Sequence, residues 1–86
     1  MMNYPLVKQV FPMPGQRLEI NYENGEIRIF DVTPYIKGSW YGMLADPDVF
    51  ATVHPVGDTV EWEDGQDIAP HELYELSMPA EKSTPA

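Results

Sequence analysis

The chain has 86 residues, of which 43% are hydrophobic, and it has no cysteine and a formal net charge of −9 at pH 7. This length fits one domain with a thin core, and the hydrophobic content excludes a chain that is disordered throughout. The lack of cysteine excludes disulfides, thiolate nucleophiles and cysteine-bound metals, and it fits a reducing, cytoplasmic compartment.

The first part of the chain predicts strands. Residues 6–11 form an apolar run typical of a strand, and residues 12–15 form a connection. Residues 17–22 and 26–30 alternate polar and apolar side chains, the pattern of half-buried strands. Asn24-Gly25 lies between them and favours a two-residue type I′ turn, which requires positive φ at both central residues. That turn sets a register with three expected pairs: Tyr22 with Ile27, Ile20 with Ile29, and Asn21 with Arg28.

Two short helical segments are expected next. A helical turn over residues 33–36 has Thr33 as its N-cap and Pro34 in its first position. Residues 40–44 are too short a run to assign. Asp46-Pro47 favours the start of a brief helix that buries Val49 and Phe50, because Asp is a good N-cap and Pro suits the first helical turn.

A second hairpin and a helix complete the predicted fold. Residues 52–56 and 59–62 flank a Gly57-Asp58 turn, in a register that pairs His54 with Glu61 and Val53 with Trp62. A further turn lies at residues 64–65, and a helix is expected over residues 70–77, with Leu73 and Leu76 facing the sheet.

The fold class predicted from these elements is α+β, with a small, mainly antiparallel sheet built from hairpins and one or two short helices. One domain is expected over residues 1–78, followed by a flexible C-terminal tail over residues 79–86.

Charge is distributed unevenly along the chain. Up to residue 37, four basic residues balance four acidic ones, whereas residues 38–81 hold ten acidic residues and no Lys or Arg. Crowded like charges raise the local negative potential, which repels phosphate, so direct nucleic-acid binding is not expected. The N-terminus lacks the features of a secretion signal, and no apolar run reaches membrane-spanning length.

Chemistry-bearing motifs are scarce. His54 lies opposite Glu61 in the predicted hairpin, and a His–carboxylate site can bind zinc or act as general acid and base. Neither His54 nor His71 belongs to a metal-binding motif, and the carboxylates of residues 58–67 do not match a calcium loop. We therefore expect no catalytic residue, no cofactor and no metal site.

Several segments together resemble a known family. In order and spacing, residues 23–26, 30–34, 44–50, 60–62 and 67–74 are similar to the bacterial and phage family called domain of unknown function 2442. The resemblance covers residues 4 to about 76, and it implies a small α+β domain with no established activity and no catalytic residue. Some members are fused to a helix-turn-helix domain, whereas others are encoded beside a second small protein, an arrangement suggestive of toxin–antitoxin pairs. Asp31, Trp62 and Asp67 recur in the family, in structural or functional roles.

The sequence thus favours a non-enzymatic interaction module, antitoxin-like, that presents its acidic second half to a basic protein partner. The candidate contact residues are Asp58, Glu61, Trp62, Glu63, Asp64 and Asp67. Trp62 is either an apolar anchor for the partner or part of the core. Two alternatives stay open: a small acidic enzyme or metal-dependent hydrolase that uses His54 and nearby carboxylates, and a regulatory domain without a DNA-binding extension. The identity of the partner and the oligomeric state are open at this point.

Overall fold

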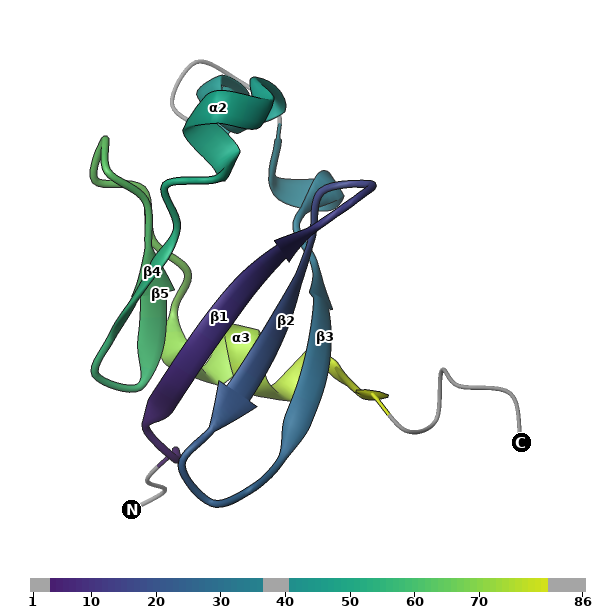
Figure 1. Cartoon of the computed structure of the whole chain (residues 1–86), viewed down its shortest axis with the longest axis vertical. Coiled ribbons are helices and arrows are strands. Elements are labelled where there is room, and N and C mark those ends of the chain that lie inside the picture. The colour runs from purple at the N-terminus through teal and green to yellow at the C-terminus, as the bar shows by residue number, and fades with distance from the viewer. Residues whose placement is uncertain (1–3, 37–40, 81–86) are drawn as a thin grey trace.

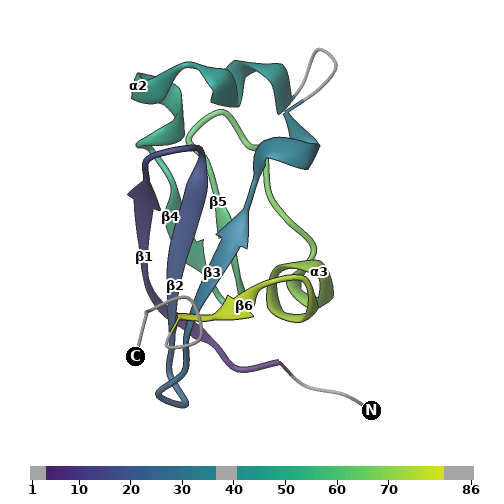
Figure 2. The same ribbon diagram turned by 90° about the vertical axis from the view of Figure 1, so that its right-hand side faces the viewer.

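A four-stranded antiparallel sheet forms the larger part of the protein. The computed structural model describes residues 4–36 and 41–80, and its sheet has the strand order β1-β2-β3-β6 (Figures 1 and 2). The strands are β1 (Val7–Met13), β2 (Arg17–Tyr22), β3 (Ile27–Asp31) and β6 (Met78–Pro79). The predicted strand over residues 17–22 is confirmed. β1 runs on through Pro12, where a connection was expected, because a proline is tolerated in a strand at the edge of a sheet.

The loop between β2 and β3 differs from the predicted two-residue turn. The Tyr22 amide donates to the Glu26 carbonyl at 2.9 Å, and the Gly25 amide donates to the Tyr22 carbonyl at 3.0 Å. Within the loop only Gly25 has positive φ, at +96°. This is the three-residue loop built from a type I turn followed by a left-handed glycine.

The longer loop moves the register of β2 against β3 by one residue. The observed pairs are Asn21 with Ile27, Ile20 with Arg28, Glu19 with Ile29, and Leu18 with Phe30. The predicted pairing is therefore wrong. Since neighbouring residues of a strand point to opposite faces, the one-residue shift moves the two isoleucines to the outside and places Arg28 and Phe30 on the core side.

Short helices connect the two halves of the chain. They are η1 (Thr33–Tyr35), η2 (Gly42–Ala45) and α2 (Pro47–Phe50). The predicted start of α2 is confirmed, with the Asp46 side chain accepting a hydrogen bond from the Asp48 amide at 2.9 Å. Thr33 does not cap η1 as predicted, because it is the first residue of that helix and its amide donates to the Asp31 carboxylate at 3.0 Å. Residue 40 and residues 81–86 of the predicted tail lie outside the described residues, whereas Pro79, the first residue of that tail, pairs with Arg28 in β6.

The second hairpin forms in the predicted register, but its strands are shorter than predicted and the expected pair of Val53 with Trp62 is not part of them. It consists of β4 (His54–Val56) and β5 (Thr59–Glu61), with His54 opposite Glu61. The Val7 amide donates to the Gly57 carbonyl at 2.9 Å and ties the turn of this hairpin to the start of β1.

Helix α3 (Pro70–Glu75) is shorter than predicted. Leu73 is fully buried, but Leu76 is 63% exposed, so the expectation that both leucines face the sheet is wrong. The chain leaves the helix before Leu76 and continues into β6, which pairs with β3, and this ending turns Leu76 away from the core.

The core lies between the sheet and the elements of the second half. α3 crosses one face of the sheet, the β4–β5 hairpin stands beside β1, and α2 closes one end (Figures 1 and 2). The buried hydrophobic residues are Val7, Leu18, Ile20, Tyr22, Phe30, Val32, Leu44, Phe50, Val60, Trp62, Ile68 and Leu73. The predicted α+β class is confirmed. Within the described ranges, no helix is long and apolar enough to cross a membrane.

Candidate functional site

Trp62 is a core residue. Its side chain is fully buried, its indole Nε1 donates to the Phe50 carbonyl at 3.0 Å, and its ring lies 5.9 Å from that of Phe50. A side chain that is enclosed in this way cannot reach a partner without unfolding the hairpin. Trp62 therefore belongs to the core and is not an apolar anchor for a partner. Its burial fixes the position of the residues that follow it.

The two residues after Trp62 are held in a tight turn. The Trp62 amide donates to the Gln66 carbonyl at 2.8 Å, the Gly65 amide donates to the Trp62 carbonyl at 2.9 Å, and Gly65 has φ of +100°. The Glu63 amide also donates to the Thr52 hydroxyl at 3.1 Å. These bonds fix the turn against the end of α2 while Glu63 and Asp64 remain exposed.

The turn and α2 together enclose an acidic hollow. It has a volume of about 250 Å³ and is lined by Asp48, Val49, Thr52, Glu63 and Asp64. Three carboxylates from two separate segments thus share one concavity, with Val49 as its apolar side chain. In the sequence, Asp48 was only part of a helix start, and its proximity to the turn could not be foreseen.

No cation balances the acidic hollow within the described residues. The ion pairs of the structure join Arg28 to Glu26 and the two histidines to neighbouring glutamates, and none of them includes a carboxylate of the hollow. The sequence supplies no Lys or Arg between residues 38 and 81. The negative potential of the hollow is therefore directed toward solvent.

The other predicted contact residues lie elsewhere. Asp58 is in the turn at the opposite end of the β4–β5 hairpin from Glu63 and Asp64 (Figure 1). Asp67 bridges back to Glu61, and its carbonyl accepts from the Tyr41 hydroxyl at 2.8 Å. Burial raises the pKa of Tyr41, and the nearby carboxylates of Asp67 and Glu72 raise it further. The structure thus brings together Glu63 and Asp64 but not the whole predicted set.

The histidines form exposed pairs with glutamates. His54 Nε2 lies 3.6 Å from Glu61 Oε1, with the two side chains 48% and 38% exposed. His71 Nε2 lies 3.9 Å from Glu72 Oε2 on the first turn of α3. In the part of the chain that the structure describes, no group of three or more metal-ligating side chains could hold a metal ion.

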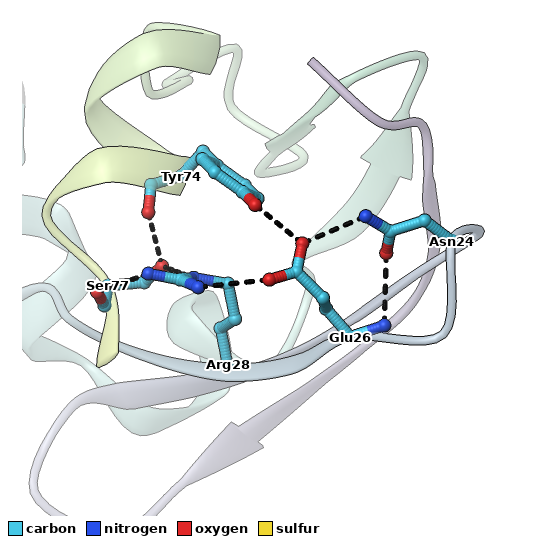
Figure 3. Close-up of polar contacts among 5 residues, drawn as sticks. All are labelled: Asn24, Glu26, Arg28, Tyr74 and Ser77. Atoms are coloured by element: carbon cyan, nitrogen blue, oxygen red, sulfur yellow. Dashed lines mark hydrogen bonds and ion pairs between the residues drawn. The ribbon is translucent and has the colours of Figure 1, made fainter. Parts of the chain in front are cut away.

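A polar cluster that sequence reasoning missed joins the first hairpin to the C-terminal segment (Figure 3). Arg28 Nε donates to the Ser77 hydroxyl at 2.6 Å, and Arg28 Nη2 donates to the Ser77 carbonyl at 2.9 Å. Arg28 Nη1 contacts Glu26 at 3.2 Å, and the guanidinium lies 4.6 Å from the centre of the Tyr74 ring. Glu26 accepts from the Tyr74 hydroxyl at 2.6 Å and from Asn24 Nδ2 at 2.8 Å. We call these five residues the Arg28 cluster.

Hydrogen bonds set the ionisation of the Arg28 cluster. The Tyr74 hydroxyl, followed by Asn24 and Arg28, holds the pKa of Glu26 below its ordinary value. The same bond to Glu26 raises the pKa of Tyr74, because an ionised phenol could not donate it. Because these polar groups are hydrogen-bonded to one another, the cluster stabilises the contact between the first hairpin and α3. The sequence could have indicated the cluster only with the correct register of β3.

Comparison with protein families settles the family of this chain. Residues 7–79 match the model of the family described as protein of unknown function, DUF2442. The chain belongs to this family. This confirms the resemblance seen in the sequence, and the matched region runs from the start of β1 to the end of β6. Neither the curated proteins nor the solved structures contain a match to the chain.

Proposed function

We propose that this DUF2442 protein is a non-enzymatic interaction module, antitoxin-like, that binds a basic protein partner through the acidic hollow. The observation that supports this is the meeting of Asp48, Glu63 and Asp64 around one concavity, with no balancing cation among the described residues. The resemblance to a bacterial and phage family in which some members are encoded beside a second small protein supports the antitoxin-like part.

The size of the hollow favours a protein side chain over a small molecule. Its volume of about 250 Å³ lies below the roughly 300–1,000 Å³ of typical small-molecule sites. A Lys or Arg side chain supplies the opposite charge, and its aliphatic stem can lie along Val49. Exposed charges contribute mainly to the rate of association, so an apolar contact at Val49 is needed for affinity.

A comparative pull-down from the native host tests the proposal. The baits are the wild type, the double variant Glu63→Lys/Asp64→Lys, and the matched variant Glu23→Lys/Asp58→Lys, which changes the net charge equally but away from the hollow. Circular dichroism and thermal unfolding establish that all three baits are folded. Quantitative mass spectrometry should then reveal a basic protein that the first variant loses and the matched variant retains.

The captured protein should also associate with the wild type in a salt-dependent way. Exposed charges are screened beyond about 8 Å at physiological ionic strength, so the association rate should fall steeply as salt rises. Equal loss of the partner from both variants would assign the effect to net charge alone. That result, a partner retained by all three baits, or the absence of any enriched basic protein would each refute the proposal.

A further inference from the structure

One face of the four-stranded sheet is left uncovered by the elements that the structure describes. α3 and the β4–β5 hairpin lie on the core side, and none of the described elements lies over the opposite face (Figures 1 and 2). The strand register identifies the residues of this outer sheet face, because directly paired residues point to the same side. One row consists of Phe11, Glu19, Ile29 and Met78, and the next consists of Gln9, Asn21 and Ile27.

Apolar side chains lie on the outer sheet face at both of its edges, with the polar residues Glu19 and Asn21 of β2 between them. Phe11 on β1 is 46% exposed, Ile27 on β3 is 41% exposed and Met78 on β6 is 62% exposed. Ile29 is half-buried between them, in the same row as Phe11 and Met78. Single exposed apolar residues are common on soluble proteins, but four apolar side chains on one sheet face that no described element covers favour a contact surface.

The outer sheet face is also nearly neutral. Its rows contain Glu19, which accepts from Asn21 Nδ2 at 3.0 Å, and at one end the pair formed by Arg17 and Asp31. One basic and two acidic residues on this face contrast with a net charge of −9 for the whole chain. Two copies of so acidic a protein repel each other over most of their surface, and this face is where they can meet with little repulsion.

We propose that the outer sheet face binds a second copy of this chain, giving a twofold-symmetric pair of sheets packed face to face. A basic partner is attracted to the acidic hollow formed by α2 and the turn at residues 63–65, and a strongly acidic partner would be repelled by the chain as a whole. A second copy brings a surface of the same nearly neutral charge and the same exposed apolar side chains, as a twofold contact requires. Stacked sheets of this kind pack about 10 Å apart with interleaved side chains.

The size of the face predicts a weak dimer. Four strands about 4.8 Å apart and about five residues of roughly 3.3 Å each give a patch near 300–400 Å² on each copy. Stable interfaces bury about 800 Å² on each partner, so the contact belongs with weak and transient associations. We expect a dissociation constant in the micromolar to sub-millimolar range.

Sedimentation of the full chain over a concentration series tests the proposal. The mass should rise from that of a 9.8 kDa monomer toward twice that value as concentration approaches about 1 mM. Added monovalent salt should strengthen the dimer by screening the repulsion between acidic chains, which is the opposite of its effect on a basic partner. Phe11→Lys and Ile27→Lys should each weaken dimerisation at least tenfold.

Two matched variants place an equal charge away from the outer sheet face. Met43→Lys in η2 and Val56→Lys in β4 also replace exposed apolar residues, and both should dimerise as the wild type does or better. Circular dichroism shows whether each variant is folded. A wild type that stays monomeric at about 1 mM refutes the proposal, as does a dimer broken by the matched variants but not by Phe11→Lys. A chain shortened after residue 80 that dimerises more tightly would show that its own C-terminal segment occupies this face, which also refutes it.

Discussion

Arg28 lies on the core face of β3, where three residues contact its guanidinium. Its side chain is 14% exposed and contacts Ser77, Glu26 and the face of the Tyr74 ring. An arginine in this position is tolerated because its donors are paired, and an unpaired charge here would cost several kcal/mol. Arg28 thereby links the end of α3 and the start of β6 to the first hairpin.

Glu26 makes the free energy of unfolding depend on pH in the acidic range. Its pKa is below the ordinary value of 4.5, so the unfolded chain binds the proton more readily than the folded one. The stabilisation is complete above about pH 4.5 and is lost as pH falls through the lower folded pKa. We expect Glu26→Gln to cost about 1 kcal/mol at pH 7, given the partial exposure of the side chain.

Urea unfolding of the wild type and Glu26→Gln between pH 7 and pH 3 measures this effect. The free-energy difference between the two proteins should shrink steadily below pH 4.5. Glu23→Gln, at an exposed position of the same loop, should run parallel to the wild type. A constant difference for Glu26→Gln across the whole pH range would contradict a lowered pKa.

At the scale of elements, two loops of the protein have the same construction. In residues 22–26 and 62–66, an aromatic residue is followed by Glu, then Asn or Asp, then Gly, and both loops form the same two backbone hydrogen bonds. Gly25 and Gly65 have φ of +96° and +100°. The aromatic residue that begins each loop, Tyr22 or Trp62, is buried, so each loop reverses the chain direction next to a core side chain.

Gly25→Val should destabilise the protein by about 1–3 kcal/mol, the strain of a β-branched residue at positive φ. A Cβ at Gly25 would meet no atom within 4 Å, so the cost comes from the backbone and not from a steric clash. Gly42→Val is the control, because Gly42 also has open space but does not have positive φ. Thermal unfolding should show a lower midpoint for the first variant only, and equal midpoints would rule out a left-handed residue at Gly25.

The register of β2 and β3 can be tested by two truncations on adjacent residues. In the structure Arg28 faces the core and Ile27 faces solvent, whereas the two-residue turn would have exchanged them. Arg28→Ala should therefore cost about 2 kcal/mol, the value of hydrogen bonds to a charged group. Ile27→Ala should change stability by less than about 0.5 kcal/mol. Denaturant unfolding measures both effects. A larger loss of stability for Ile27→Ala than for Arg28→Ala would favour the register of the two-residue turn.

At the scale of the whole molecule, charge is distributed unevenly between two surfaces. The outer sheet face is nearly neutral, whereas the hollow between α2 and the turn at residues 63–65 is acidic and unbalanced within the described structure. The two surfaces are formed by different halves of the chain, apart from Met78. One molecule could therefore hold a basic partner and a second copy at the same time.

The exposed carboxylates and histidines of this chain should not form a tight metal site. His54 and His71 lie on different elements, each paired only with a glutamate, and the hollow supplies carboxylates without a surrounding cage. Calorimetric titration with zinc or calcium should show binding no tighter than about 10⁻⁴ M, the weak range for carboxylate sites. Stoichiometric micromolar binding that His54→Ala abolishes would contradict this and favour a metal-dependent activity.

The sequence by itself determined the features that depend on a few neighbouring residues. The cap at Asp46 and Pro47, the Gly57-Asp58 turn and the alternation over residues 17–22 follow from side-chain hydrogen bonding, backbone freedom and the two-residue period of a strand. The family resemblance was visible for the same reason, since it rests on short motifs in order.

Only the tertiary structure decided the register of the first hairpin and the composition of the sites. Asn24-Gly25 suits both a two-residue and a three-residue loop, so local chemistry alone leaves the register open by one residue. In the structure the longer loop buries Phe30 opposite Leu18, while α3 supplies Tyr74 and the segment between α3 and β6 supplies Ser77 to pair Arg28. The burial of Trp62 and the meeting of Asp48 with Glu63 and Asp64 arise in the same way. They depend on contacts between segments far apart in the chain, which no local pattern encodes.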